Sequence, residues 1–365
     1  MKIKDIISYL ASIAPPEFQE SYDNSGLIVG NPSQEVTGVL VTLDCIEEII
    51  DEAIAQNINL VVAHHPIVFS GIKKLNGKNY VERTVIKAVK HDIAIYAIHT
   101  NLDNVIHGVN HKISSKLGLE NVKILSPKKN TLLKLTTFVP NEHKNDVLAA
   151  LSEAGAGNIG NYEECSFQLE GQGTFKPNAK ANPHIGEQGK LEHVAETRIE
   201  VILPFHLKGR VLNAMRQAHP YEEVAYYLNQ LDNTNQEVGS GMVGKLPEAL
   251  SPTEFLDYLK TRMELSCIRH TKLLDKKIQK VALCGGAGSF LLRAAKSAKA
   301  DVFITGDFKY HEFFDAEDQI IIADIGHFES EKFTRELLYD LLVEAFPKVK
   351  TTISKVDTNP VNYYF

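Results

Sequence analysis

The sequence has little of what marks a secreted, membrane or nucleic-acid-binding protein. Its four cysteines (Cys45, Cys165, Cys267 and Cys284) form no CxxC motif and are too scattered for a disulfide framework. No stretch approaches the ~18 apolar residues of a membrane helix, and the N-terminus has no apolar signal-peptide core. The formal net charge is −7, so no basic excess favours nucleic acid. We therefore expect a cytoplasmic protein with reduced thiols and neither a membrane nor a nucleic-acid partner.

The length and composition are those of an ordinary globular protein with a sizeable core. The chain has 365 residues, which favours two or three domains. Hydrophobic residues make up 44% and charged residues 23% of the chain. A core large enough for independent stability is therefore easy to build.

Strand and helix patterns alternate in the first and last thirds of the chain. The first third has helix patterns at 3–12, 46–55 and 81–90 and strand patterns at 36–43, 60–63 and 93–98, with Asp44 as a candidate cap of the second helix. The last third has strand patterns at 280–284, 301–304, 320–323 and 349–354 and helix patterns at 290–298 and 328–345. This alternation predicts an α/β architecture.

The middle third follows a different rhythm. It has strand patterns at 132–139, 165–169, 196–203 and 224–228, helix patterns at 142–154 and 208–217, and a loop rich in Gly, Pro, Asn and Lys at 171–189. The order predicts a ferredoxin-like α+β module. We expect this module, at 128–232, to be inserted into one α/β domain split between 1–127 and 233–365.

Two adjacent histidines stand where a buried strand ends. His64 and His65 follow the apolar run that ends at Ala63, and Pro66 turns the chain directly after them. Packing gives little reason for two imidazoles at such a position, and neutral imidazole is the commonest metal ligand among side chains. The two residues are therefore candidate metal ligands.

Similar side chains follow two other strand patterns. His99 and Asp103 come after the strand that ends at Ile98, and His327 and Glu331 come after the strand that ends at Ala323. The His327 and Glu331 spacing of i, i+4 puts both side chains on one helix face. Open α/β sheets bind ligands at the carboxyl ends of their strands. One histidine alone is more simply a surface or core residue, but three such segments together favour a metal site.

The adjacency of His64 and His65 favours two ions over one. Neighbouring residues of a regular strand point to opposite sides, so a turn at Pro66 can give one imidazole to each ion, with Asp103 or Glu331 as a bridge. Two ions ~3.5–4 Å apart are a common hydrolytic device. Mixed imidazole and carboxylate ligands suit Zn, Fe, Mn, Ni or Co better than Mg or Ca.

Three weaker motifs have competing interpretations. The run from Cys284 to Ser289 (CGGAGS) can cradle a phosphate, but it lacks a Walker A ending, and we favour a tight strand-to-helix turn. His311 follows another strand end and is a candidate for proton transfer, with a helix-surface residue as the alternative. His219, in the run HPYEE, is interpreted as structural because no partner ligands recur nearby.

Several of these segments together resemble the GTP cyclohydrolase 1 type 2 homologue family, the Nif-three-like dinuclear metal proteins. The motifs that carry the resemblance span nearly the whole chain: YDNSGL at 22–27, AHHP at 63–66, HTNLD at 99–103, CGGAGS at 284–289, DVFITGD at 301–307 and GHFESE at 326–331. One departure is Tyr22, where the family usually has Trp.

The resemblance implies a metal-ligand set, a middle domain and an assembly. It implies that two divalent ions are held by His64, His65, Asp103, His327 and Glu331. Among the metals that suit imidazole and carboxylate ligands, we favour Zn over Fe, Mn, Ni or Co. It implies that the middle domain is similar to PII and CutA proteins, with signatures in GQGTFKP at 171–177 and HPYEE at 219–223. It also implies a homohexameric toroid. The roles of His99 and His311 are left open.

The sequence therefore predicts metal-dependent hydrolysis of a small molecule. The family name implies ring opening of GTP to dihydroneopterin triphosphate and formate, although no residue pattern here identifies a guanine pocket. Three alternatives remain: a phosphoesterase or nucleotide hydrolase, a metal chaperone or insertase without turnover, and a regulatory protein whose insert senses a ligand.

Overall fold

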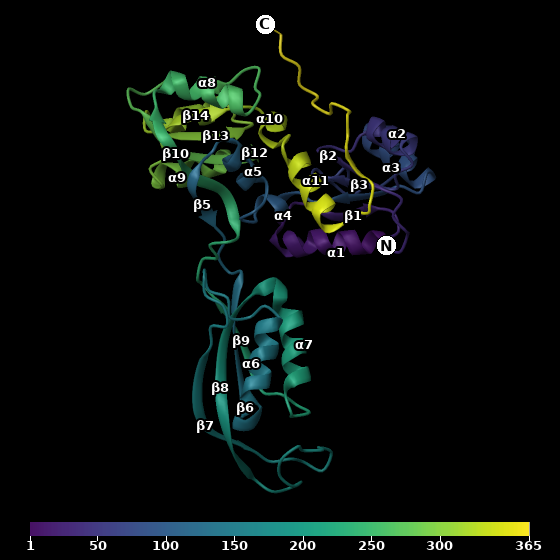
Figure 1. Cartoon of the computed structure of the whole chain (residues 1–365), viewed down its shortest axis with the longest axis vertical. Helices are drawn as coiled ribbons and strands as arrows, with labels where there is room; N and C mark the ends of the chain where they lie inside the picture. The colour runs from purple at the N-terminus through teal and green to yellow at the C-terminus, as the bar shows by residue number, and fades with distance from the viewer. Residues whose placement is uncertain (365) are drawn as a thin grey trace. The chain divides into compact units, whose positions relative to one another are not determined.

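The computed structural model describes residues 1–364, whose contacts divide the chain into two compact units (Figure 1). One unit is the segment Lys128–Gln236, and the other joins the chain on either side of it. The first and last thirds of the sequence therefore build one split unit. Among the described residues, no helix is both long and apolar enough to cross a membrane.

The first sheet of the split unit has the strand order β1-β4-β3-β2-β15. Its strands are β1 Gly26–Val29, β2 Val39–Thr42, β3 Leu60–Ala63, β4 Ala94–Ala97 and β15 Thr351–Ile353. The strands β2, β3 and β4 run parallel and are buried along their whole length, as expected for apolar runs covered on both faces. Because β15 pairs with β2, the two ends of the chain meet in one sheet.

Helices cover both faces of this sheet. Successive strand residues point to opposite sides, so strands that are apolar throughout need to be buried on both faces. The helices are α1 Ile3–Ile13, α2 Glu47–Ala55, α3 Tyr80–Lys90 and α11 Thr334–Ala345. On one face, Ile50 of α2 and Ala88 of α3 share a core cluster with Leu40 of β2. On the other face, Ile6 of α1 shares a cluster with the next strand residue, Val41. The strand patterns predicted at 36–43, 60–63 and 93–98 thus contain β2, β3 and β4, which form the centre of the sheet.

The second sheet of the split unit has the strand order β11-β14-β13-β12-β10-β5. Its strands are β5 Glu120–Pro127, β10 Gly239–Leu250, β11 Arg269–His270, β12 Ile278–Ala287, β13 Val302–Gly306 and β14 Ile321–Asp324. The strands β12, β13 and β14 run parallel, so their carboxyl ends lie at one edge. The helices near this sheet are α4 Thr100–Asp103, α5 Val109–Lys116, α8 Pro252–Arg262, α9 Leu292–Ser297 and α10 His327–Glu331.

The inserted unit is an antiparallel sheet with two helices. Its strand order is β7-β8-β6-β9, and the elements are β6 Leu132–Pro140, α6 Lys144–Glu153, β7 Phe167–Phe175, β8 Glu192–Pro204, α7 Lys208–Ala218 and β9 Tyr226–Leu231. Val147 of α6 and Val211 of α7 share a core cluster with Leu135 of β6. Both helices therefore pack against the sheet through one apolar core.

The structure corrects three of the predicted elements. The helix expected at 328–345 is two helices, α10 and α11, and α10 begins one residue earlier, at His327. The loop expected at 171–189 begins later, because β7 continues to Phe175 in register with β8. Asp44 does not cap α2, whose N-cap is Ile46 without a side-chain hydrogen bond. The carboxylate of Asp44 has another partner, described below.

Candidate metal centre

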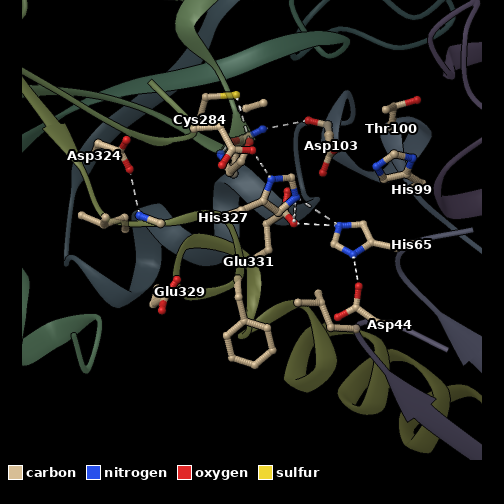
Figure 2. Close-up of a pocket in the computed structure, with 18 of the residues that line it drawn as sticks. Asp44, His65, His99, Thr100, Asp103, Cys284, Asp324, His327, Glu329 and Glu331 are labelled. Carbon is tan, nitrogen blue, oxygen red and sulfur yellow. Dashed lines mark hydrogen bonds and ion pairs between the residues drawn. The ribbon is translucent and has the colours of Figure 1, made fainter. Parts of the chain in front are cut away.

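The carboxyl ends of strands from both sheets of the split unit line one cavity of about 730 Å³. Asp44 follows β2, His65 follows β3 and His99 follows β4, whereas Asp307 and His327 follow β13 and β14. Figure 2 shows His65, His327 and Glu331 meeting in this cavity, with Asp44 on the other side of the His65 ring. The side chains that the sequence predicts at strand ends thus meet because parallel strands carry their carboxyl ends to one edge of each sheet.

His64 is buried and held in one tautomer. Its Nδ1 lies 2.8 Å from the carbonyl oxygen of Ile98, which can only accept, so Nδ1 carries the proton. In the neutral ring this leaves Nε2 as the acceptor, and Nε2 faces Asp103 Oδ1 at 3.6 Å and Glu331 Oε1 at 3.9 Å. Among the described residues, Nε2 of His64 and Oδ1 of Asp103 are buried atoms without a hydrogen-bond partner. Two orphaned ligand atoms that face each other fit a missing cation.

His65 and His327 converge on the other oxygen of Glu331. The Nε2 atoms of His65 and His327 lie 2.9 Å and 3.1 Å from Oε2 of Glu331, and 3.4 Å from each other (Figure 2). Two ligands ~2.0–2.1 Å from one tetrahedral ion are separated by about 3.4 Å. At their other nitrogen, His65 Nδ1 donates to Asp44 at 2.8 Å and His327 Nδ1 donates to Asp307 at 2.7 Å. These carboxylates fix the ring orientations.

The ring of His99, like those of the other three histidines, is oriented by a hydrogen-bond acceptor at Nδ1. Its Nδ1 lies 2.7 Å from Oδ1 of Asp23, and its ring centroid is 5.3 Å from those of His64 and His65. Asp23 is itself fixed by the backbone N–H and hydroxyl of Thr100. Burial opposes ionisation of Asp23, but the hydrogen bonds from His99 and Thr100 more than offset it and hold the pKa of Asp23 well below its usual range.

The electrostatics of the cluster are those of charges packed together away from water. Burial lowers the pKa of His65, but Asp44 and Glu331 more than offset this and raise it to about 10. In the same way Glu331 and Asp307 raise the pKa of His327 to about 11. Burial and the nearby Glu331 raise the pKa of Asp103, whereas the histidines hold the pKa of Glu331 low against the effect of its burial. Positive charge from protons or cations therefore stabilises this cluster.

The ligand atoms form two overlapping triads. His64, Asp103 and Glu331 offer atoms within 4.8 Å of one another, as do His65, His327 and Glu331. Glu331 belongs to both triads, with Oε1 towards His64 and Oε2 towards His65 and His327. A third group joins His99 to His64 and His65. This donor set of imidazoles and carboxylates fits two neighbouring ions that share one carboxylate.

The glycine-rich turn at 284–289 makes room for Glu331 instead of cradling a phosphate. The N–H groups of Gly285, Gly286 and Gly288 already donate to Asn110, Ser330 and Thr305, respectively. Gly286 has φ +62°, and a Cβ at this position would lie 2.3 Å from Oε1 of Glu331. The absence of a side chain at Gly286 therefore lets the backbone of the turn lie close to the Glu331 carboxylate.

Neither His311 nor His219 belongs to the groups of candidate ligands in this cluster. His311 does not line the cavity: its exposed ring stacks on Phe314 and meets Tyr310 edge-on. Its candidate proton-transfer role has no support from this placement. His219 belongs to the inserted unit, where Nε2 donates to the carbonyl of Phe138 and Nδ1 accepts from the N–H of Tyr221. Neither nitrogen of His219 is free for a metal.

The carboxylates that orient the histidines have no assigned role in the sequence pattern. At Asp44 the sequence favours a helix cap, and Asp23 and Asp307 lie inside family motifs. A signal was present, because Asp44 and Asp307 each follow a strand end as the candidate ligands do. Metal-binding histidines usually donate their second ring N–H to a carboxylate or carbonyl, so a search for such residues at strand ends can find them.

Comparison with known proteins identifies the family. The sequence matches the Duf34/NIF3 (NGG1p interacting factor 3) family over residues 1–360. The chain belongs to this family. This confirms the family resemblance predicted from the motifs.

A protein with a similar sequence and two solved structures match this chain over nearly its full length. A Bacillus subtilis (strain 168) protein named GTP cyclohydrolase 1 type 2 homolog is 38% identical, with 99% of this chain and 98% of the relative covered. A crystal structure of a Bacillus cereus protein related to NIF3 superposes with a TM-score of 0.87 at 37% identity, covering 100% of this chain and 99% of that one. Staphylococcus aureus protein SA1388 superposes with a TM-score of 0.78 at 29% identity, covering 100% and 99%.

Proposed function

We propose that this Duf34/NIF3 protein binds two divalent metal ions and catalyses a hydrolytic reaction. His64, Asp103 and Glu331 would hold one ion, and His65, His327 and Glu331 the other, with Zn favoured over Fe, Mn, Ni or Co. The observation that carries the proposal is the sharing of Glu331 by two triads whose histidines are oriented through Nδ1. When bound, two such ions supply Lewis-acid chemistry to a substrate and to water.

The chain's own residues prepare the site for this chemistry. The Nδ1 partners of His65 and His327 point both Nε2 atoms at Glu331 before any ion arrives, so ordering costs little on binding. The Asp23–His99 pair stands beside His64 and His65 with its own hydrogen bond formed. Exposed aromatic rings of Tyr22 and Phe69 lie 6.3 Å apart at the cavity, where they can cover a planar substrate.

The lining of the cavity bears on the substrate class. Seven acidic side chains line the described cavity, against Arg269 as its one Lys or Arg. Arg269 is already paired, with its guanidinium 3.1 Å from Asp324 and donating to the carbonyl of Phe308. A triphosphate would meet this acidic wall with the two ions as its only cations besides the paired Arg269. We therefore propose a substrate with few phosphate groups and an electrophilic carbon that the ions can reach.

The test compares guanine compounds of increasing charge. The relatives' name makes GTP ring opening the first reaction to assay, with the full chain loaded with Zn, Mn, Fe, Ni or Co and with formate release and pterin fluorescence as readouts. We expect the KM to fall from GTP to GMP to guanosine as phosphates are removed. A KM lowest for GTP would contradict the substrate class. No turnover of these or of phosphoester substrates with any metal would contradict a hydrolase and favour metal handling.

A double variant tests whether turnover depends on the bound metal ions. His65→Ala/Glu331→Ala removes one imidazole and the shared carboxylate, so we expect it to lose bound metal and all turnover. Glu82→Ala is a suitable control, because its carboxylate accepts hydrogen bonds around the start of α3, away from the cavity. Activity retained in the double variant would refute the two-metal mechanism.

Two further proposals follow from the family resemblance. The strand order β7-β8-β6-β9 around α6 and α7 supports a ferredoxin-like, PII/CutA-like fold for the insert. The resemblance implies a homohexamer, and exposed aromatic side chains are consistent with a subunit contact: Tyr310 and Phe314 are 72% and 66% exposed with ring centroids 5.7 Å apart. Light scattering tests the assembly, and a monomer at micromolar concentration would contradict it.

A further inference from the structure

A second group of metal-ligand side chains lies in the inserted unit. Glu142 and His143 end the short 3-10 helix Asn141–His143 before α6, and His184 belongs to the loop 176–191 between β7 and β8. One ring nitrogen of each histidine and one carboxylate oxygen of Glu142 lie within 4.8 Å of one another. The ring centroids of His143 and His184 are 5.7 Å apart, and His143 Nε2 lies 3.6 Å from Glu142 Oε1. Segments 41 residues apart thus bring two imidazoles and a carboxylate together.

The surroundings single out these three side chains as the ligands. His219 lies close enough that the charge of His143 lowers its pKa in addition to burial, but both of its nitrogens are already hydrogen-bonded. Glu142 and His184 are exposed and can rotate, so the three ligand atoms can close to the ~3.4 Å separation of a tetrahedral site. Two imidazoles and one carboxylate form a zinc-type donor set that leaves a fourth position to water.

An ion at this position would fix the wall of a second cavity. The cavity has about 990 Å³ and is lined on the loop side by Pro183, His184 and Ile185 and on the sheet side by Glu196 and Tyr227. The loop is held to the rest of the unit through Asn182, whose N–H donates to Glu222 at 2.8 Å. A metal bond to His184, whose ring centroid lies 6.4 Å from that of Tyr221, would restrict the loop further, because each added closure of a chain segment lowers its conformational entropy.

We propose that Glu142, His143 and His184 form a separate divalent-cation site of zinc type, and that its occupancy fixes the β7–β8 loop over the cavity of the inserted unit. The site is independent of the cluster around Glu331, so neither proposal depends on the other. The cation is recognised by imidazole nitrogen and carboxylate oxygen, which excludes Ca²⁺ and Mg²⁺ as preferred ligands.

Metal stoichiometry tests the site in the full-length protein. Metal-free wild type, His184→Ala and His193→Ala are titrated with Zn²⁺, and His193 is the control because it is an exposed histidine of the same unit outside the cluster. We expect His184→Ala to bind one ion fewer than wild type and His193→Ala to match wild type. An unchanged stoichiometry in His184→Ala would overturn the proposal.

The same comparison in a second background separates the two metal proposals. In His65→Ala/Glu331→Ala, adding His184→Ala is expected to remove one more ion. If the double variant loses no metal relative to wild type while His184→Ala still does, the central site fails and the site in the insert stands.

Limited proteolysis tests the effect on the loop. Trypsin can cut after Lys180 or Lys190, which flank His184. At a free Zn²⁺ concentration 100 times the Kd, cleavage that requires opening of the site should slow by up to about 100-fold in wild type. We expect no slowing in His184→Ala. Equal cleavage of wild type with and without Zn²⁺ would overturn the tie to the loop.

Discussion

The Nε2 atoms of His65 and His327 lie 3.4 Å apart, although 262 residues separate them in the chain. One histidine follows a strand of the first sheet and the other follows a strand of the second, so both halves of the split unit must be folded for the pair to exist. Asn110 strengthens the same junction, because its amide donates to the carbonyl of Asp103 and accepts from the N–H of Gly285. The candidate metal centre can therefore form only when both sheets of the split unit are folded.

The Asp44 carboxylate is expected to set the metal affinity of His65. Asp44→Ala removes the acceptor of His65 Nδ1–H and should lower the affinity of the central site about 10–100-fold, as other partners of metal-binding histidines do. Competition with a chromophoric chelator measures the affinity. Asp44→Asn should restore part of it, because an amide oxygen can accept the same proton. Asp51→Ala, which removes a surface ion pair with Lys87, is the control, and equal losses in both Ala variants would contradict this role.

A methyl group at Gly286 is expected to disturb both the fold and the metal centre. Gly286→Ala forces a left-handed residue and places Cβ against the Glu331 carboxylate, so unfolding free energy should fall by about 1–3 kcal/mol and metal content should drop. Denaturant unfolding and elemental analysis measure the two effects. Gly209→Ala is the matched control, since Gly209 lies in helix α7 with open space around it and should lose no stability. Normal metal binding by Gly286→Ala would refute the steric argument.

The sequence could predict the buried parallel strands and the residues that follow them. The runs ending at Ala63 and Ile98 are apolar throughout and bounded by polar residues, so burial on both faces leaves a pattern that local sequence shows. His64, His65 and His99 were found because their place at a strand end is also a local feature. The sequence names Asp103 and Glu331 as alternative bridges, and the choice between them depends on how the two sheets meet, which places Glu331 in both triads.

Other elements were missed because tertiary pairing overrides weak local signals. Strand β10 contains Gly239, Gly241 and Gly244, which disfavour a strand, yet it lies between β5 and β12 in the sheet. The partner of Asp23 was equally hidden, because His99 is 76 residues away. Such pairings arise only in the assembled fold and produce no recognisable residue spacing in the sequence.

The partly buried carboxylate of Asp301 gives a pH-dependent contribution to stability. It accepts from the backbone N–H groups of Gln279 and Lys280 and from the Lys276 ammonium, which lower the pKa of Asp301 against the effect of its burial. Because the folded pKa lies below the unfolded value of about 3.9, the stabilisation is complete above that value and disappears as pH falls through the folded pKa.

Asp301→Asn should therefore cost about 1–2 kcal/mol of unfolding free energy near neutral pH, and the difference from wild type should shrink below pH ~4. Urea unfolding at several pH values measures it. The exposed Asp257→Asn is the control and should change stability little at any pH. A difference that stays constant down to pH ~2.5 would show that the charge of Asp301 does not contribute.

The split unit is expected to fold without the insert, because the chain leaves and re-enters it at neighbouring positions. Pro127 and Gly239 are register partners in the antiparallel pair of β5 and β10, and Ser126 and Ser240 are the next pair. A short Gly-Ser linker in place of Lys128–Gln236 can therefore join the two strands as a hairpin does. Circular dichroism and elemental analysis of this variant should find a cooperative fold that retains the metal of the central site. An unfolded or aggregated product would mean that the insert is needed to bring the outer thirds together.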